Sequence, residues 1–512
     1  MKILKSGGES TGTPEKIKLL TSYIKNIPET IVLVVSAPAG KKRVTELLKD
    51  MFNGKDKKED INQVYVELAQ GLGINFDTDI IWRNIEDAKR VDDYLYRGEY
   101  AQATLISNYL RKEGVNAVFV DAKEAILTDS NFGDGKILGI KDELFRNHQV
   151  YVVGGYHGAN EIGETVVLPI GGSDITAGAL AGYLKANEYQ NLKEIPGVAV
   201  VDPKYIRDSI IMRNATFAEI REAVYRSRKS LLEPISLKWC KRENIPIRIK
   251  SLQHPDKEGT LITNGRDLTN QPPLTNIACK EGFIIYDCLK KQNSAFFTKS
   301  FEIFQSYNIS IDMINTMDNV VSIAVHKSEL KERDDVEKQL REISQSLKIY
   351  DDQALVSIVG EGIVKPLTFK KWLMDNLENQ PLAIYGPILG GLRTDLTTFY
   401  IELFGMNSIV GYTKNLTNFF EKNNLSIIAT STCIDAFSIG VNEKLSKKEI
   451  LEICDKLKKE VGADTICVTE NGLHCYGPEK DVRNLTLAVP EKIANGTVTE
   501  IYTKLVAKGY FF

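Results

Sequence analysis

Cysteine is scarce in this chain of 512 residues, and its placement does not suit cross-linking. Only seven cysteines occur, the first is Cys240, and none forms a CxxC pair. The five histidines are scattered without the spacing of metal ligands. An odd number of unpatterned cysteines argues against a disulfide framework and against a zinc site, and it favours a reducing compartment. We therefore predict no protein-built metal site and a cytoplasmic location.

Charge of one sign and long apolar runs are lacking as well. The 65 lysines and arginines nearly balance the 68 acidic residues, which leaves a net charge of −3. A near-neutral chain offers no electrostatic support for nucleic acid or an anionic membrane as a partner. No apolar stretch reaches the roughly 18 residues of a membrane helix. The chain enters a predicted strand within three residues, which leaves no room for a signal peptide.

Two glycine turns carry most of the functional information. Lys5-Ser6-Gly7-Gly8 follows a short apolar run, and Gly171-Gly172-Ser173-Asp174 precedes a small-residue helical pattern over 175–186. Each has the order strand, glycine turn, helix start, which presents backbone N–H groups to a phosphate. Either turn alone is more often a simple tight turn. Together they supply two anion cradles, a lysine and an aspartate, which are the parts that phosphoryl transfer requires.

Strands and helices alternate through residues 1–262. Helical patterns separate the strands, as at 14–26, 100–112 and 218–228. Apolar runs predict strands at 31–36, 117–120, 150–153 and 198–201, with a weaker one at 247–250 that suits a strand start or a sheet edge because it follows a proline. Strands that are apolar on both faces belong to a parallel sheet between helix layers. The predicted fold class is therefore α/β, a three-layer αβα domain with a mainly parallel sheet.

Further motifs follow in an order that resembles one known family. They are Val34-Val35-Ser36-Ala37-Pro38, Val44-Thr45-Glu46-Leu47-Leu48, Arg97-Gly98-Glu99-Tyr100, Thr128-Asp129-Ser130-Asn131-Phe132-Gly133, Val153-Gly154-Gly155-Tyr156-His157-Gly158 and Asp202-Pro203-Lys204. In this order they resemble aspartate kinases of the amino-acid kinase family. The resemblance covers residues 1–262 and continues into the C-terminal half. It implies a reaction of ATP with L-aspartate that gives ADP and 4-phospho-L-aspartate, with Mg²⁺ bridging the nucleotide phosphates.

The resemblance also implies roles for individual residues. Lys5 would neutralise the transferring phosphoryl group, and Asp174 would hold Lys5 in place. Thr45, Glu99 and Ser173 would bind the amino-acid substrate, with Glu99 on its ammonium group. The residues expected at ATP are Lys5, Ser6, Gly7, Gly8, Gly155, Gly171, Gly172, Lys193, Glu194 and Lys204. Simpler explanations stay open: Asp174 or Thr45 as a helix cap, and Glu99 as a surface acid.

Several ligand-contacting positions depart from the family pattern. Ile170 stands where the family has an arginine that pairs with a substrate carboxylate. Lys42, Arg43 and Arg97 are the nearby cations that could compensate. In the nucleotide segment, the family has Thr-Asp at the positions of Lys193 and Glu194, and an arginine at the position of Lys204. In the first turn, Ser6 and Glu9 replace the usual phenylalanine and hydroxyl residue.

The second half contains an internal repeat. Residues 299–362 and 414–472 share the order helix, strand, strand, helix, strand, and a leading strand completes a ferredoxin-like βαββαβ unit in each. Paired units of this kind resemble the ACT regulatory domains of aspartate kinases. We predict a kinase domain at 1–262, a linker at 263–273, ACT-like units at 274–363 and 397–512, and an intervening segment at 364–396. The resemblance implies lysine or threonine as an effector, and exposed sheet edges favour a homodimer or larger assembly.

Three functional hypotheses follow. The first is an aspartate kinase regulated by amino-acid binding to its ACT-like units. The second keeps the reaction and changes the acceptor to another amino acid or carboxylate, because Ile170 cannot replace a bidentate arginine. The third is a non-catalytic amino-acid sensor, in which the ACT-like pair is the working part.

Overall fold

The computed structural model divides the chain into two compact units. Unit 1 comprises residues 1–198, 211–217 and 231–266, and unit 2 comprises residues 199–210, 218–230 and 267–512. The structure describes residues 1–40, 43–225, 233–254, 257–291, 296–317, 319–363, 369, 372–373, 375–377, 383–385, 396–403, 412–432, 436–441, 443–463, 465–470, 473–476 and 482–511. Most of the predicted intervening segment lies outside these residues, as does Lys42.

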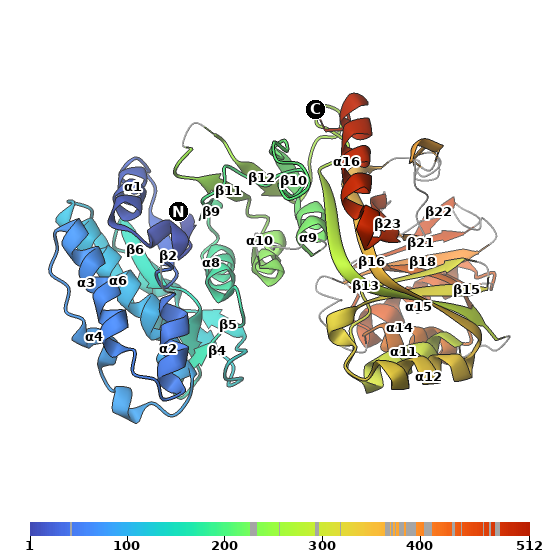
Figure 1. Ribbon diagram of the computed structural model, residues 1–512, viewed down its shortest axis with the longest axis horizontal. Coiled ribbons are helices and arrows are strands. Elements are labelled where there is room, and N and C mark those ends of the chain that lie inside the picture. Colours follow the sequence, from blue (N-terminus) through green and yellow to red (C-terminus); the bar gives the residue numbers. More distant parts are fainter. Residues whose placement is uncertain are drawn as a thin grey trace. The chain divides into compact units, whose positions relative to one another are not determined.

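Unit 1 is built on an eight-stranded sheet with the order β10-β12-β11-β9-β1-β2-β6-β3 (Figure 1). Its strands are parallel except where β11 meets β12. The strands are β1 (Lys2–Ser6), β2 (Ile31–Val35), β3 (Ala117–Val120), β6 (Val150–Gly154), β9 (Glu188–Lys193), β10 (Asn214–Thr216), β11 (Ile247–Ser251) and β12 (Thr260–Thr263). The mainly parallel sheet agrees with the predicted α/β class.

Helices cover the sheet of unit 1. One face packs against a core to which α1, α2, α3 and α6 contribute, while α8 contacts β1 and β9. Every residue of β2 is buried, as expected of a strand covered on both faces. The helices are α1 (Pro14–Lys25), α2 (Val44–Phe52), α3 (Lys58–Leu72), α4 (Asp79–Trp82), α5 (Asp92–Leu95), α6 (Arg97–Lys112), α7 (Ala122–Ala125), α8 (Gly172–Tyr183) and α10 (Leu237–Arg242).

One predicted strand of the sheet is absent, and one strand was missed. Residues 198–201 form no strand and contribute only single bridge residues, Ala199 and Val201. The neighbouring strand of the sheet is instead β9, whose polar sequence EYQNLK hides it from an apolar pattern. The weaker strand prediction is confirmed as β11, which starts directly after Pro246, but β11 lies between β12 and β9 and so is not at the sheet edge. Pro246 precedes the paired residues, and its carbonyl accepts a hydrogen bond from Tyr189 N at 2.9 Å.

A small four-stranded sheet, ordered β5-β4-β7-β8, completes unit 1. Its strands are β4 (Ile126–Thr128), β5 (Ile137–Ile140), β7 (His157–Ala159) and β8 (Thr165–Val167).

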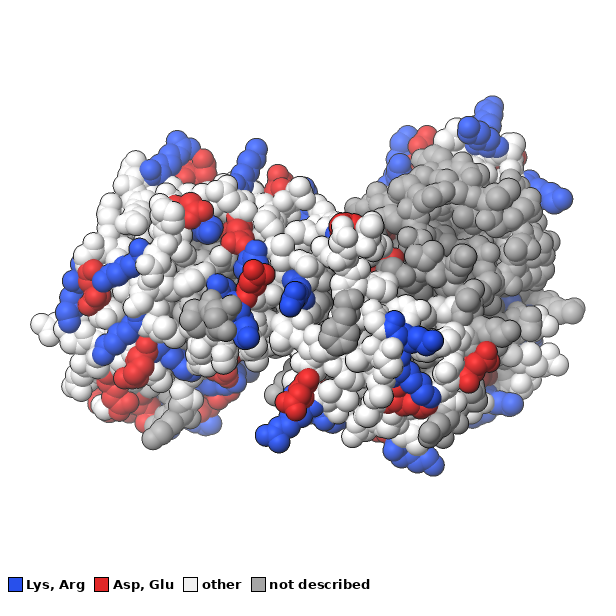
Figure 2. Space-filling model, turned by 90° about the horizontal axis from the view of Figure 1, so that it is seen from above, with Lys and Arg blue, Asp and Glu red and all other residues white. Residues whose placement is uncertain are grey.

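On the face of the molecule drawn in Figure 2, basic and acidic side chains are mixed, in keeping with the near-zero net charge.

Unit 2 contains both predicted repeats within one eleven-stranded sheet. In the first copy, β13 (Asn276–Lys290), β14 (Met313–Met317), β15 (Val320–His326) and β16 (Ser344–Ile363) accompany α11 (Phe296–Ser306) and α12 (Arg333–Ile343). In the second, β18 (Thr397–Glu402), β19 (Ile427–Thr432), β20 (Ala436–Val441) and β21 (Thr465–Glu470) accompany α14 (Tyr412–Lys422) and α15 (Lys447–Glu460). Both copies have the βαββαβ order, and β14 pairs with β19 at the seam between them.

The ends of α11 and α14 show that the two copies share local detail. Asn308 and Asn424, the first residues of the matching Asn-x-Ser-Ile motifs, have left-handed φ values of 54° and 57°. The next N–H in each copy donates to the carbonyl of the preceding helix, Ile309 to Phe304 and Leu425 to Phe420, both at 2.9 Å. This arrangement is a helix C-cap in which asparagine tolerates the left-handed conformation.

The C-terminal elements of unit 2 return to the first copy. β23 (Val482–Pro490) pairs with β16 and with β17 (Ala383–Tyr385), and α16 (Glu491–Ala507) packs on β13 and β16. A further strand, β22 (Leu473–Tyr476), borders β21. The helix α9 (Phe217–Tyr225) belongs to unit 2 except for its first residue.

Candidate active site

The two glycine turns of the sequence meet at the carboxyl ends of inner strands of the unit 1 sheet. Strands β1 and β9 are parallel neighbours, with Lys5 level with Asn191 and Ser6 level with Leu192. The helix α8 contacts both strands and begins beside their carboxyl ends, where Asp174 occupies its first turn. Ligands of open α/β sheets bind at these strand ends, and the first turn of a helix presents N–H groups without intrahelical partners.

Lys5 and Asp174 form a buried ion pair at these strand ends. The Nζ atom of Lys5 lies 2.8 Å from Oδ1 of Asp174, and the two side chains are 8% and 9% exposed. Asn191 donates a hydrogen bond from Nδ2 to the same oxygen at 3.0 Å. The structure thus brings together the lysine and the aspartate that the sequence singled out from opposite ends of the domain.

Asp174 has a second cationic partner. The Nζ atom of Lys193 lies 3.7 Å from Oδ2 of Asp174. Burial raises the pKa of Asp174, but the charges of Lys5 and Lys193 and the hydrogen bonds from Lys5 and Asn191 outweigh it and bring the pKa down to about 2. The carboxylate therefore stays ionised at any physiological pH.

Glu99 supplies a second acid of different character. It lies in the first turn of α6, is buried, and has no hydrogen-bond partner at Oε2. Burial raises the pKa of Glu99 to about 8, although backbone N–H groups and the charge of Lys5 oppose the rise. A carboxyl group of this kind is neutral near pH 7 and becomes ionised when a cation arrives.

Glycine is required where the backbone segments of the site approach each other. A Cβ atom at Gly8 would lie 2.2 Å from the carbonyl oxygen of Ala37, and one at Gly155 would lie 2.6 Å from Cβ of Ser173. Gly171, at the start of α8, has a left-handed φ of 82°. The ammonium of Lys5 lies 3.7 Å from the Cβ position of Gly7, so it folds back beneath the first turn.

Other predicted residues have different surroundings. The Glu194 carboxylate accepts hydrogen bonds from Lys16 Nζ at 3.2 Å and from Gln253 Nε2 at 2.5 Å. Thr45 is half-buried in the first turn of α2, and Ser173 is buried beside Gly155. Lys204 belongs to unit 2, where its Nζ lies 2.9 Å from Oε1 of Glu281.

Neither Arg43 nor Arg97 is free to replace the missing arginine at Ile170. Ile170 itself is 92% exposed. Arg97 is buried and donates to the carbonyls of Asp93, Ile81 and Arg83. Arg43 is exposed and pairs with Glu9 at 3.6 Å. Both guanidinium groups are therefore engaged within the protein.

Sequence reasoning missed Asn191, which is fully buried and joins Asp174 to the hydroxyl of Tyr189. The available signal was a polar residue between Tyr189 and Leu192, the two apolar residues of a strand. Because β9 was not recognised as a strand, its register with β1 could not be used.

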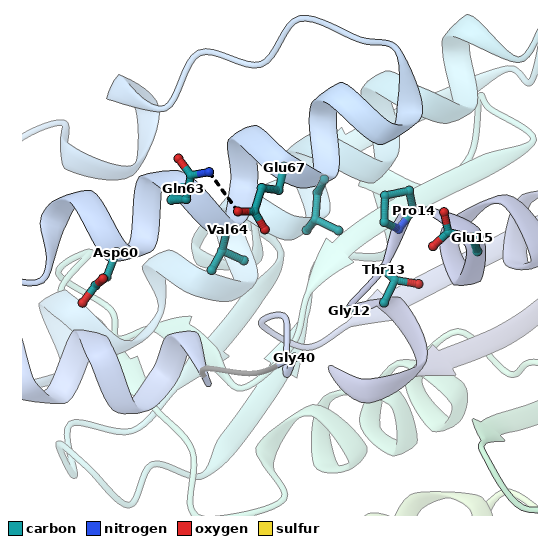
Figure 3. Close-up of a pocket in the computed structure, with 10 residues that line it drawn as sticks. Gly12, Thr13, Pro14, Glu15, Gly40, Asp60, Gln63, Val64 and Glu67 are labelled. Carbon is teal, nitrogen blue, oxygen red and sulfur yellow. Dashed lines mark hydrogen bonds between the residues drawn. The ribbon is translucent and has the colours of Figure 1, made fainter.

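A separate cavity of about 500 Å³ lies between the start of α1 and one face of α3 (Figure 3). Its lining includes Gly12, Pro14, Gly40, Val64 and Glu67, and no predicted site residue. A Cβ atom at Gly12 would lie 2.9 Å from the carbonyl of Gly8, so the cavity borders the back of the first glycine turn.

Two features are absent from the described part of the chain. Within those residues, no group of three or more histidine, cysteine, aspartate or glutamate side chains could hold a metal ion. Within the same residues, no helix is long and apolar enough to cross a membrane.

Comparison with known proteins identifies the family of this chain. The family model for the amino acid kinase family matches residues 1–251, and this defines the class of the first unit. The aspartate kinase of Pseudomonas putida is 30% identical over 385 residues, which cover 70% of this chain and 84% of that protein. The chain belongs to the aspartate kinase family.

Solved structures of aspartate kinases share the fold. The Clostridium acetobutylicum enzyme superposes with a TM-score of 0.64 at 21% identity, over 90% of this chain and 99% of that one. Escherichia coli aspartokinase III gives 0.61 at 19% identity in complex with aspartate and ADP, over 99% and 100% of the chains. Its complex with lysine and aspartate gives 0.63 at 18% identity, over 99% of both.

Proposed function

We propose that unit 1 transfers the γ-phosphoryl group of ATP to the side-chain carboxylate of L-aspartate. A carboxylate oxygen attacks the γ-phosphorus, the bond from that phosphorus to the bridging oxygen breaks, and ADP leaves with the electron pair. The products are 4-phospho-L-aspartate and ADP. The observation that carries the proposal is the buried Lys5–Asp174 pair, 2.8 Å long, beside the start of α8.

Each residue of the site has a physical task in this reaction. Lys5 offsets the charge that develops on the transferring group, and Asp174 fixes its ammonium in place. The glycine turns at Gly7-Gly8 and Gly171-Gly172 present N–H groups to the phosphates. Glu99 binds the substrate ammonium, while Thr45 and Ser173 hydrogen-bond its carboxylates.

Magnesium is proposed as a companion of the nucleotide. Both oxygens of Asp174 lie against ammonium groups, and the described residues contain no cluster of three carboxylate or imidazole ligands. These residues therefore form no dedicated magnesium cage. Mg²⁺ requires few protein ligands when phosphate oxygens and water complete its shell. The ion would neutralise phosphate charge. The tasks given above to Lys5, Asp174 and the glycine turns are those of the protein itself.

Regulation is proposed for unit 2. The two ACT-like copies form one continuous sheet through the β14–β19 pair, so a ligand at either copy acts on a connected element. Lysine or threonine is the proposed effector class, supported by the lysine complex of the E. coli enzyme. A cytoplasmic homodimer or larger assembly remains part of the proposal.

The activity is tested by ADP release in the presence of ATP, Mg²⁺ and L-aspartate, with hydroxylamine trapping of the acyl phosphate. We expect ADP and hydroxamate in equal amounts, and neither without aspartate. A folded protein that yields no hydroxamate with millimolar aspartate would rule the reaction out.

A second candidate keeps the reaction with a different acceptor. The exposure of Ile170 and the internal pairing of Arg43 and Arg97 favour it, because neither of these two arginines is free to bind a second substrate carboxylate. A screen of amino acids and simple carboxylates distinguishes the two candidates. In the same screen, Ile170→Arg is expected to move preference toward aspartate.

A further inference from the structure

We propose that Lys193 is a second phosphate-binding cation of the active site and that it contacts the terminal phosphates of the nucleotide together with Lys5. The inference rests on the proposed function and deepens it. The family resemblance places this position in the nucleotide segment, but with a threonine, so the part of an ammonium group at the terminal phosphates is argued from the contacts of this chain. Two ammonium groups meet at one carboxylate: Lys5 lies at Oδ1 and Lys193 at Oδ2 of Asp174.

The topology directs Lys193 to the same strand ends as the two glycine turns. Leu192 is level with Ser6 across the parallel β1–β9 pair, so Lys193 is level with the next residue, Gly7. Lys193 is also the last residue of β9, opposite Ser251 of β11. The strand β9 therefore ends at Lys193, level with the point where the chain passes from β1 into its glycine turn.

The charges at this point do not cancel. Lys5 and Lys193 bring two positive charges to the single negative charge of Asp174, and Glu99 is neutral below a pH of about 8. The charge of Glu9 also acts on Lys193, but the Glu9 side chain is 65% exposed and pairs with Arg43 at 3.6 Å. Burial lowers the pKa of Lys193, attraction to Asp174 raises it, and repulsion from Lys5 lowers it again. A bound phosphate would relieve that repulsion. The surplus of positive charge therefore fits an anionic ligand.

Lys193 differs from Lys16, another lysine of unit 1. The Nζ atom of Lys16 lies 3.2 Å from Oε1 of Glu194, a carboxylate of its own. Among the described residues, Lys193 forms an ion pair only with Asp174, at 3.7 Å. Lys5, at 2.8 Å, already neutralises the charge of that carboxylate. Its side chain is 22% exposed whereas that of Asp174 is 9% exposed, so the ammonium of Lys193 is the more accessible of the pair.

A purely structural role for Lys193 makes a different prediction. If Lys193 only balanced Asp174, its removal would affect folding and leave nucleotide binding to Lys5 and the glycine turns. If it binds the terminal phosphates, its removal weakens binding of ligands that carry them and has little effect on a ligand with the α-phosphate alone.

The experiment is calorimetric titration of the full chain with ADP, with a non-hydrolysable ATP analogue and with AMP. We expect Lys193→Met to weaken binding of ADP and the analogue by about 10- to 100-fold, the range for a lost hydrogen bond to a charged group. Binding of AMP should change by less than about threefold, and Lys193→Arg should keep most of the affinity because it keeps the charge. The matched control is Lys25→Met, which removes an exposed ion pair to Glu113 in the same unit.

The outcomes separate this inference from the proposed function. Wild-type affinity for ADP and the analogue in Lys193→Met would overturn the inference and leave the proposed function intact. Equal weakening in Lys193→Met and Lys193→Arg would assign a structural role and overturn it as well. A wild-type protein that binds no nucleotide would overturn the proposed function and the inference together. A melting temperature for each variant, and Lys193→Gln as a second neutral substitution, show whether the fold is retained.

Discussion

The ammonium of Lys5 lies 2.8 Å from the carboxylate of Asp174, and both side chains are almost fully buried. Removing two charges from water costs several kcal/mol per ion, and their mutual attraction only partly offsets it. Such a pair is weak evidence for stability. Its value here is geometric, because it fixes a cation between two glycine turns where a phosphate can bind.

Replacement of Lys5 should abolish turnover and leave the fold intact. We expect Lys5→Met to lower kcat by at least about 100-fold, since preorganised electrostatic contacts contribute that much in comparable sites. Asp174 keeps Lys193 and Asn191 as partners, so no uncompensated charge is left buried. Circular dichroism and ADP release measure the two effects. Unchanged turnover in folded Lys5→Met would refute the role.

Glu99 should make stability depend on pH in a defined direction. Its folded pKa, about 8, exceeds the ordinary value of 4.5, so the folded protein holds a proton that the unfolded chain has released. This group's contribution to stability therefore falls as pH rises from about 4.5 to 8. Glu99→Gln should melt higher than the wild type at pH 9 and gain less at pH 6. An equal difference in melting temperature at the two pH values would contradict the assignment.

The same carboxyl group should release a proton when substrate binds near pH 7, because an ammonium ion favours the ionised form. Titration with aspartate in buffers of different ionisation enthalpy measures this release. The wild type should release up to one proton, and Glu99→Gln should release none and bind aspartate more weakly.

Asn191 should act as a positioning residue for Asp174. Its amide donates to Oδ1 of Asp174 and to the Tyr189 hydroxyl, so Asn191→Leu frees the carboxylate to rotate. We expect kcat to fall about tenfold, consistent with loss of one hydrogen bond to a charged group, while KM for ATP stays within about twofold. The control is Gln190→Leu. Gln190 directly precedes Asn191 in β9, and its side chain bonds Tyr23 and Glu188 instead. Equal loss of activity in both variants would indicate a general effect on β9.

Two glycines in helices should respond oppositely to alanine. A Cβ atom at Gly178 of α8 would lie 2.1 Å from the carbonyl oxygen of Ser236, whereas one at Gly496 of α16 meets nothing within 4 Å. Gly178→Ala should therefore lower the free energy of unfolding by about 1–3 kcal/mol through overpacking. Gly496→Ala should raise it by about 0.5–1 kcal/mol through helix propensity. Thermal unfolding measures both, and stabilisation by Gly178→Ala would show that α8 can move away from its neighbour.

The strongest sequence signals were those that local rules determine. Apolar runs found β2, β3 and β6, and the repeat found both βαββαβ copies, because burial on two faces and internal symmetry leave direct patterns. The turns at Gly7-Gly8 and Gly171-Gly172 were visible since Gly171 has a left-handed φ and the backbone at Gly8 and Gly172 leaves no room for a Cβ atom.

The remaining features depend on contacts between distant residues. β9 was not predicted as a strand because it carries the polar residues Gln190 and Asn191, whose side chains bond Tyr23 and Asp174 in the folded protein. The second ammonium on Asp174 follows from the β1–β9 register, and that register could not be used without β9. The buried state of Glu99 likewise depends on packing that no local pattern shows.

The most direct test of the account is a crystal structure of the protein with Mg²⁺, L-aspartate and a non-hydrolysable ATP analogue. The account predicts a terminal phosphate oxygen within about 3 Å of the Lys5 ammonium, a normal hydrogen-bond distance, with Asp174 still paired to that lysine. A nucleotide whose phosphates lie away from Lys5 and from the start of α8 would contradict it.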